Sequence, residues 1–475
     1  MRILLIQPNS VEEVNREYFS LQYPINLGYI AAALRENGHN VEMVDFNVVS
    51  REKLSYFITK YQPELAGVTA MTSSIFNAKD IISEVKRIDK NIITVIGGVH
   101  ASALPGETME EIKDLDYLVF GEGEKTIVEL VKNIVNKGDL GGVEGVVFRR
   151  DGKIIKNKPR DLIENLDTIP FPARDLLSTE LYAKQHVSRG FSRREMKIAE
   201  IITSRGCPNN CIFCAGHINY GNRLRFRSYE NIANEITECI KKYGITHISI
   251  EDDTFTINKY LVRKLSHFFN EKSITYNCNA RVDTVDYNLL KLMADSGCKK
   301  VSFGVESGSP SILKKLKKGI TLPQIIKAVK EAKKAGIRYV ECDFMIGSHI
   351  DETINDVQDS FKLIYKLMPD FIAVSIMCPY PGTEIYKMMV DNDYLYKNPD
   401  WSQFSLFGNL RRYKRITNLT PGQMFELQRK ILKEYYSSPK YIFSQLIQLG
   451  TLSEMKYFWK MGKLFLKEMM FKKPA

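Results

Sequence analysis

The sequence lacks the features of a membrane-spanning or exported chain. No apolar run approaches the roughly 18–20 residues that a transmembrane helix needs. The first residues, MRILLIQPNS, have the composition of a buried strand. They lack the charged region, the long apolar stretch and the small-residue cleavage site of a signal peptide. We therefore expect a cytoplasmic protein.

Cysteine is scarce, and most of it is scattered. Three of the eight cysteines lie between positions 207 and 214. A chain of 475 residues can build its core without a disulfide framework. We therefore interpret the other five as small buried hydrophobic residues: Cys239, Cys278, Cys298, Cys342 and Cys378.

Over most of the chain, Lys and Arg barely outnumber Asp and Glu. The net charge is +11, and residues 411–475 hold 14 Lys or Arg against 4 Asp or Glu. A nucleic-acid enzyme would usually carry its basic patch beside its site. Because the excess is confined to the last residues, the sequence indicates no nucleic-acid partner.

Residues 1–137 alternate short apolar runs with amphipathic stretches. Such alternation predicts an α/β domain with a doubly wound parallel sheet. The expected strands are Ile3–Ile6, Val41–Asp45, Leu65–Val68, Ile92–Ile96 and Tyr117–Phe120. Ligands bind such sheets outside the carboxyl ends of the strands. The turns Thr69–Ser74, Gly97–Ser102 and Gly121–Glu124 lie there.

The rest of the chain divides into three parts. Residues 138–195 are expected to form a connector, with a hairpin that pairs 146–149 with 153–156. Residues 196–395 resume the alternation and predict a partial (β/α)6 barrel, whose active site would lie at the carboxyl ends of its strands. Residues 396–475 are expected to be a basic helical region.

The barrel's first predicted strand leads into Cys207, Cys211 and Cys214, spaced C-x3-C-x2-C. Three thiolates leave one iron of a four-iron cluster without a protein ligand. The alternatives are zinc, which prefers four ligands and could recruit His217, or a chance grouping of cysteines. The spacing, with Phe213 before the last cysteine, strongly resembles the radical S-adenosylmethionine (SAM) superfamily.

That resemblance implies a [4Fe–4S] cluster that cleaves SAM to a 5′-deoxyadenosyl radical. It also implies an electron donor such as flavodoxin or ferredoxin. The chemistry belongs to these cofactors, and the protein binds and orients them.

Charged residues follow the next three predicted strands. One of Glu251, Asp252 and Asp253 could accept the SAM ammonium, the alternative being a helix cap or a strand-end turn. Arg281 could bind the SAM carboxylate or ribose, the alternative being an internal salt bridge. Glu306 could hold the ribose hydroxyls. These segments resemble radical SAM barrels that follow a cobalamin-type domain.

The turns of the first domain resemble the cobalamin-binding domain of B12-dependent radical SAM enzymes. In that resemblance Gly97 and Gly98 let the backbone approach the nucleotide tail, and Thr69 and Thr72 offer hydroxyls. Many cobalamin domains place a cobalt-ligating His after the first strand, but residues 7–13 contain none. We expect His100 to contact the nucleotide or a neighbouring residue rather than cobalt.

The resemblance implies a methyltransferase acting at an unactivated carbon. The radical would remove a substrate hydrogen, methylcobalamin would supply the methyl group, and a second SAM would remethylate cobalt. The alternatives are cyclisation, oxygen insertion or carbon–carbon joining on a tetrapyrrole or lipid. A non-enzymatic alternative is a corrinoid-binding sensor with a structural cluster.

The last predicted helix, 454–471, is amphipathic. Its lysines recur at helical spacing and share one face: Lys456, Lys460, Lys463 and Lys467. A helix with one basic face and one Trp/Phe/Leu face can lie in a membrane interface. That would make the protein membrane-peripheral, with a lipid or other small-molecule substrate. The alternative is a helix that packs its apolar face on the barrel while the lysines stay solvated.

Overall fold

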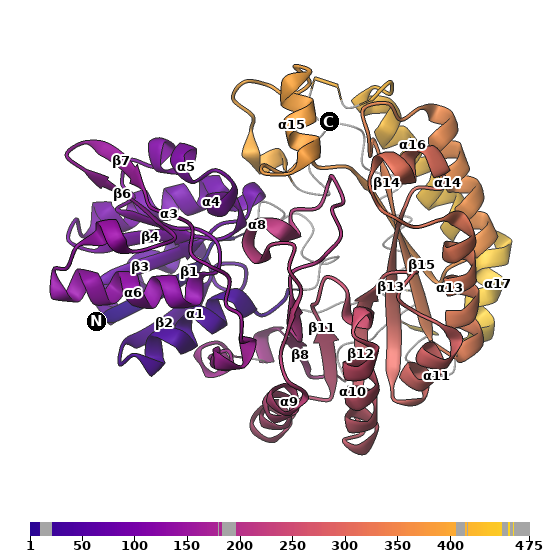
Figure 1. The fold of residues 1–475 in the computed structure, drawn as a ribbon, viewed down its shortest axis with the longest axis horizontal. Helices are drawn as coiled ribbons and strands as arrows, with labels where there is room; N and C mark the ends of the chain where they lie inside the picture. The colour runs from indigo at the N-terminus through magenta and orange to yellow at the C-terminus, as the bar shows by residue number, and fades with distance from the viewer. Residues whose placement is uncertain are drawn as a thin grey trace.

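The computed structural model describes residues 1–9, 21–178, 180–182, 196–404, 414–415, 417–448, 455–456 and 459. Its chain forms two large β-sheets side by side, each with helices packed against it (Figure 1). A helical C-terminal part follows. The fold is therefore the α/β architecture that the sequence predicts.

The N-terminal sheet has the order β2-β1-β3-β4-β5-β6-β7, in which β1 to β5 are parallel. Its strands are β1 (Arg2–Gln7), β2 (Asn40–Asp45), β3 (Leu65–Thr69), β4 (Ile93–Gly97), β5 (Tyr117–Val119), β6 (Val146–Arg150) and β7 (Lys153–Lys156). The helices are α1 (Ile25–Glu36), α2 (Leu54–Tyr61), α3 (Ile75–Ile88), α4 (Val99–Ala103), α5 (Pro105–Glu111) and α6 (Gly123–Asn136).

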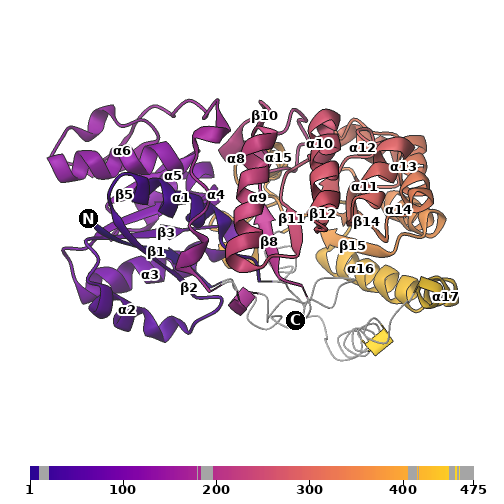
Figure 2. The same cartoon turned by 90° about the horizontal axis from the view of Figure 1, so that it is seen from below.

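The sheet is covered on both faces, because alternate residues of its strands point to opposite sides. Ile3 and Leu5 pack in one cluster with residues of α1 and α6. Leu4 and Ile6 pack in another with residues of α2 and α3. Figure 2 shows α6 and α2 on opposite sides of the sheet. The doubly wound arrangement is confirmed.

The hairpin expected in the connector forms, but it belongs to the first sheet. β6 runs antiparallel to β5, with Val119 opposite Val146, and β7 pairs with β6. The sheet is thus parallel with two antiparallel strands added at one edge. An unpaired β5 would expose a row of backbone donors and acceptors, and the hairpin covers it. The placement of 146–156 in a separate connector was wrong.

The second sheet is parallel throughout, in the order β15-β14-β13-β12-β11-β8. The strands are β8 (Ile198–Ile201), β11 (His247–Ile250), β12 (Thr275–Ala280), β13 (Cys298–Glu306), β14 (Tyr339–Ile346) and β15 (Phe371–Ile376). The outer face carries α9 (Tyr229–Tyr243), α10 (Lys259–Glu271), α11 (Tyr287–Asp295), α13 (Leu322–Ala335) and α14 (Ile354–Leu367) (Figure 1). This is the predicted partial barrel.

Short elements at the carboxyl ends of the barrel strands surround the cysteine motif. They are β9 (Ser204–Arg205), β10 (Arg225–Phe226), α8 (Gly216–Tyr220), α12 (Pro310–Lys315) and α15 (Glu384–Asp391). β9 and β10 pair antiparallel, so the chain between them is a loop closed at its base.

The C-terminal part is helical where it is described, with α16 (Pro421–Tyr436) and α17 (Pro439–Gln448). Gln428 of α16 donates to the Val374 carbonyl of β15 at 2.6 Å, which attaches the helix to the barrel. Most of the predicted helix 454–471 lies outside the described residues. Within the described part of the chain, no helix is long and apolar enough to cross a membrane.

The five scattered cysteines are all buried. Cys239, Cys278, Cys298, Cys342 and Cys378 belong to the hydrophobic core cluster. Their interpretation as small core residues is confirmed.

Candidate functional site

The cysteine motif occupies the loop between β9 and α8, at the carboxyl end of the barrel. Gly206, with φ +85°, precedes it, and a Cβ there would lie 2.3 Å from the Arg223 carbonyl oxygen. Only glycine fits that approach. Within the loop, Asn209 Nδ2 donates to Cys207 Sγ at 3.3 Å and the Gly216 amide donates to Cys214 Sγ at 3.4 Å.

The three thiols are free and lie within electrostatic reach of one another. Burial raises the pKa of Cys214 to about 11, and the Cys211 and Cys207 thiols also raise it. Burial likewise raises the pKa of Cys211, while the cations Lys318 and Arg281 oppose that rise. Thiolates in this setting need a bound cation for stability, and a cluster of irons provides one.

Among the described residues, no three His, Cys, Asp or Glu side chains are close enough to hold one metal ion. In a cubane, by contrast, each thiolate binds a different iron. The three free thiols on one short loop match the three ligands that a cluster with one open iron needs.

The carboxylates after β11 have different environments. Asp252 is buried, and its Oδ1 accepts from the Thr203 amide at 2.6 Å while its Oδ2 accepts from Ser204 Oγ at 2.6 Å. Thr203 Oγ1 also donates to it. Asp252 thus fixes the strand that enters the cysteine loop. This corresponds to the structural role at a strand end that was the alternative to SAM binding.

Glu251 and Asp253 are the better placed candidates for the SAM ammonium. A Cβ on Gly216 would lie 3.3 Å from Asp253 Oδ2 and 3.5 Å from Cys214 Sγ, so the carboxylate lies beside the thiol. Burial raises the pKa of Asp253. Glu251 Oε1 accepts from Ser249 Oγ at 2.5 Å and from Gln22 of the first domain at 3.4 Å.

Arg281 and Glu306 are both engaged in ion pairs. Arg281 donates twice to Asp283, at 3.0 and 2.8 Å, and once to the Lys318 carbonyl at 2.9 Å. Its internal salt bridge is therefore present, and binding a SAM carboxylate would require exchange with Asp283. Lys318 Nζ donates to Glu306 Oε1 at 2.8 Å.

Lys318 is a site residue that sequence reasoning missed. It is buried, and its Nζ lies 5.8 Å from the centroid of the Phe213 ring. It thereby joins Phe213, Glu306 and Arg281 into one group beside Cys211. Glu306 has a φ of +70° where the pairing of β13 with β14 shifts register. Such strain in a non-glycine residue is often found at functional sites.

We call the carboxyl edge of each parallel sheet its mouth. The four residues predicted at the mouth of the first sheet lie together at the ends of β3 and β4. Thr69 Oγ1 accepts from Asn26 Nδ2 at 3.2 Å, and Thr72 is buried. Gly98 has a φ of +101°, and a Cβ there would lie 2.6 Å from the Ala70 carbonyl oxygen. Its glycine is required by the neighbouring backbone.

Gly97 differs, because a Cβ there would meet only the Val119 carbonyl oxygen, at 3.7 Å. The space next to Gly97 is therefore open. Of the two glycines, this is the one that leaves room for a nucleotide tail.

His100 is buried in a contact between the two halves of the molecule. Its ring lies edge-on to Trp401, with the centroids 5.2 Å apart. Trp401 begins a short helix, Trp401–Gln403, that packs against Thr72–Ser74. Burial lowers the pKa of His100 to about 4. The expected contact with a neighbouring residue is present.

The inner face of the barrel is polar. Along β12, Tyr276, Cys278 and Ala280 are buried on the outer face, whereas Asn279 on the inner face is exposed. The strand registers place the following polar residues on that inner face: Glu200, His247, Ser249, Thr275, Asn277, Asn279, Lys300, Ser302, Glu341, Asp343 and Ser375. A closed barrel would instead be filled by branched apolar side chains.

Several of these residues are hydrogen-bonded across strands. Asn277 contacts His247 Nε2 at 2.7 Å and Ser249 Oγ at 3.1 Å. Glu341 accepts from Lys300 at 2.7 Å and from Ser302 at 3.0 Å. The lumen therefore offers an ordered polar wall.

The mouths of the two sheets are adjacent. α8, which ends the cysteine loop, lies against α4 of the first domain (Figure 1). A Cβ on Gly382 would touch Ile218 at 2.9 Å and Ala103 at 3.4 Å, one from each side of this contact. The helices that follow the two mouths are therefore in direct contact.

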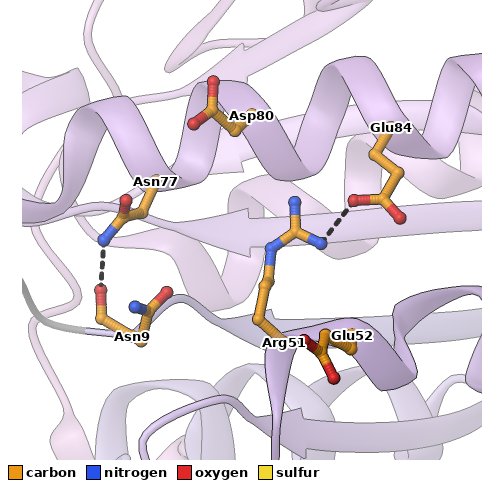
Figure 3. Close-up of a pocket in the computed structure, with 6 residues that line it drawn as sticks. All are labelled: Asn9, Arg51, Glu52, Asn77, Asp80 and Glu84. Atoms are coloured by element: carbon orange, nitrogen blue, oxygen red, sulfur yellow. Dashed lines mark hydrogen bonds and ion pairs between the residues drawn. The ribbon is translucent and has the colours of Figure 1, made fainter. Parts of the chain in front are cut away.

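A cavity of about 400 Å³ on the first domain is lined by residues of the segments that follow β1, β2 and β3 (Figure 3). Arg51 pairs with Glu84 at 2.6 Å, and Asn77 Nδ2 donates to the Asn9 carbonyl at 2.8 Å. We assign this cavity no ligand.

Comparisons with known proteins agree with this arrangement. The B12 binding domain family matches residues 14–131 and the radical SAM superfamily matches residues 201–364. The uncharacterized methyltransferase PH0819 of Pyrococcus horikoshii is 34% identical over 94% of this chain and 95% of its own. The chain belongs to the cobalamin-dependent radical SAM family. It is accordingly an enzyme that uses SAM, a [4Fe–4S] cluster and cobalamin.

Other members of the family differ in chemistry. The anaerobic magnesium-protoporphyrin IX monomethyl ester cyclase of Cereibacter sphaeroides is 25% identical over 91% of this radical SAM chain and 71% of its own. The cobalamin-dependent SAM radical enzyme OxsB, solved with aqua-cobalamin and SAM, superposes with a TM-score of 0.77. That match covers 99% of this chain and 72% of OxsB at 18% identity, and it supports the fold.

Proposed function

We propose that this enzyme transfers a methyl group to an unactivated carbon of a small polar molecule. The observation that carries the proposal is the adjacency of the two mouths. α8, which follows the thiols at the carboxyl end of the barrel, contacts α4, which follows Gly97 and Gly98. A cofactor at each mouth can then reach the same substrate carbon.

In this proposal Cys207, Cys211 and Cys214 hold the cluster, and Phe213 packs beside it. When bound, the cluster and SAM supply a 5′-deoxyadenosyl radical, and cobalamin supplies a carrier for the methyl group. Asp253 or Glu251 accepts the SAM ammonium.

The remaining positions orient the two cofactors. Arg281 binds the SAM carboxylate and Glu306 the ribose, with Lys318 balancing their charges. At the other mouth, Gly97 leaves space for the nucleotide tail, and Thr69 and Thr72 donate hydroxyls to it. Gly98 keeps the turn in place behind them. A single-electron donor such as flavodoxin or ferredoxin would reduce the cluster.

The polar lumen favours a polar substrate. Burying the exposed side chain of Asn279 against an apolar ring or chain without a hydrogen bond would cost roughly 1–3 kcal/mol. A hydrogen-bonding substrate avoids that cost. This makes a wholly apolar lipid the weaker candidate.

The rival is radical chemistry without methyl transfer, as the name of the cyclase relative implies for that protein. The test is to incubate reconstituted enzyme with methyl-labelled SAM and candidate substrates. Label in the product supports methylation, and deoxyadenosine formed without label in any product contradicts it. A corrinoid sensor with a structural cluster predicts no SAM cleavage by the reduced protein.

A second proposal concerns the C-terminal part, which we propose attaches to an anionic membrane surface. On α17, Phe443 and Ile447 are 67% and 69% exposed, and Leu446 lies exposed between them. At helical spacing these side chains form one apolar row. In the sequence they precede the lysines of the predicted tail helix, so an apolar segment is followed by a basic one.

A further inference from the structure

Two arginines and two glutamates form a buried cluster between the first domain and the cysteine loop, and we call Glu122, Glu124, Arg205 and Arg225 the interdomain clamp. Arg205 donates to Glu122 Oε1 at 2.9 Å and to Glu124 Oε1 at 2.5 Å. Arg225 donates to Glu122 Oε2 at 2.7 Å. All four are under 10% exposed, and their charges balance.

Further contacts support the four residues of the clamp. The Arg205 guanidinium lies 5.4 Å from the Tyr29 ring centroid and 5.1 Å from that of Tyr220. Arg225 also donates to the carbonyls of Ile163 and Tyr220, at 2.8 and 3.0 Å. Glu122 Oε2 accepts from the Ile163 amide at 2.7 Å. Because buried charges need such partners, their positions are tightly fixed.

The clamp lies within a continuous series of bonds between the two mouths. Ser102 Oγ donates to the Gly98 carbonyl at 2.9 Å and accepts from the Gly121 amide at 3.0 Å. Gly121 begins the turn that carries Glu122 and Glu124. On the other side, Arg205 is followed by Gly206, whose conformation only glycine adopts readily, and then by Cys207.

We propose that Glu122 and Glu124 are positioning residues that fix the cysteine loop relative to the cobalamin mouth. The inference rests on the proposed function, because it requires cobalamin at the first mouth and the cluster on the loop. An apolar interface could slide, whereas two carboxylates that grip one planar guanidinium fix its direction as well as its place. The clamp thereby sets the distance and orientation between cobalt and the cluster.

The test compares wild-type holoenzyme with Glu124→Gln, after measuring iron, sulfide and cobalamin per chain. Pulsed electron paramagnetic resonance then reports the magnetic coupling between reduced cluster and cob(II)alamin. We expect the variant to load both cofactors but to show a broadened coupling. We also expect at least a threefold lower ratio of methyl transfer to deoxyadenosine formation.

Glu235→Gln is the matched control. Glu235 is also buried and binds two arginines, Arg174 at 2.7 Å and Arg227 at 2.5 Å, which are not the arginines that bind Glu122 and Glu124. It should lower stability as much as Glu124→Gln while leaving the coupling unchanged. Equal coupling in the wild type and in Glu124→Gln would overturn the clamp.

Hydrogen exchange in the wild type covers the case in which Glu124→Gln does not fold. Cobalamin loading should slow exchange of peptides spanning 203–214 at least threefold, without SAM. No change in that loop would also overturn the clamp. If the wild type retains no corrinoid or no cluster, the proposed function fails and the clamp with it. If the wild type carries both cofactors, a failure of these tests counts against the clamp and not against the proposed function.

Discussion

The mouths of the two sheets are built from opposite kinds of residue. The barrel presents thiols and paired charges: Cys214 beside Asp253, Arg281 on Asp283, and Lys318 on Glu306. The first sheet presents glycines, threonine hydroxyls and backbone, with Gly97 facing open space. Both follow the rule that parallel sheets bind ligands at their carboxyl ends.

The difference matches the ligands of the family. SAM carries an ammonium, a carboxylate and a sulfonium, and a cluster needs thiolates, so the barrel mouth needs charge and metal ligands. The nucleotide tail of cobalamin is bulky, so the other mouth needs space and a close backbone. The first domain does carry buried charge in the interdomain clamp, where its two glutamates bind two arginines of the barrel.

The largest test of this comparison removes the thiols. Cys207→Ala, Cys211→Ala and Cys214→Ala should each abolish the cluster's visible absorption and lower deoxyadenosine formation more than 100-fold, because a ligand to the cluster is lost. Cys239→Ala is the control, since Cys239 is a buried core residue. It should keep its cluster. A cluster that persists in any of the three motif variants would contradict the assignment.

The first mouth is tested by filling its open space. Gly97→Val places methyl groups where a Cβ meets only one atom, at 3.7 Å, so the fold should tolerate it. Overlap with a bound ligand costs about 1–3 kcal/mol, and we therefore expect cobalamin binding to be roughly 5- to 150-fold weaker. Titration followed by absorption measures this.

Gly106→Ala is the control for that variant, because nothing lies within 4 Å of its Cβ position. It lies in α5 and should leave cobalamin affinity unchanged. Wild-type affinity in Gly97→Val would show that the nucleotide tail lies elsewhere.

Substitution of His100 tests whether its contact with Trp401 contributes to stability. The folded pKa of about 4 lies below the ordinary 6.5. Between these values the unfolded chain binds more protons, so stability falls as pH falls. His100→Ala should remove up to about 3 kcal/mol of that pH dependence.

The same variant should also lose about 1–3 kcal/mol at pH 7 through the lost packing on Trp401. Denaturant unfolding from pH 7 to pH 4 measures both effects. The cobalt spectrum should stay unchanged, and a shifted spectrum would instead make His100 a ligand.

The smallest expected effect concerns the attachment of the C-terminal part to an anionic membrane surface. Full-length protein should float with anionic liposomes at low salt, and a chain ending at Leu449 should float less. Each basic residue near such a surface contributes about 1 kcal/mol. Phe443→Ser should reduce flotation in the longer chain. Equal recovery of the full and shortened chains would reject membrane attachment.

Local patterns predicted much of this molecule. Strand alternation and the spacing of Cys207, Cys211 and Cys214 are short-range features, so the sheets and the cysteine loop could be foreseen. The partners of buried charges could not. Arg205 meets Glu122 across 83 positions, and no periodicity marks either residue.

The same limit explains the misplaced hairpin and Asp252. The hairpin was recognised from its own turn, but its pairing with β5 depends on which sheet edge is left uncovered. Asp252 was recognised as a strand-end carboxylate, but its bonds to Thr203 and Ser204 depend on how two strands are staggered.

The central claim is that both mouths hold working cofactors, and one reaction tests it. Reduced, reconstituted enzyme is incubated with methyl-deuterated SAM, and the SAM-derived products are quantified by mass spectrometry. We predict that 5′-deoxyadenosine forms from the cluster side and S-adenosylhomocysteine from methyl transfer, and that Gly97→Val lowers only the second. Deoxyadenosine without S-adenosylhomocysteine, in protein shown to contain cobalamin, would contradict the account.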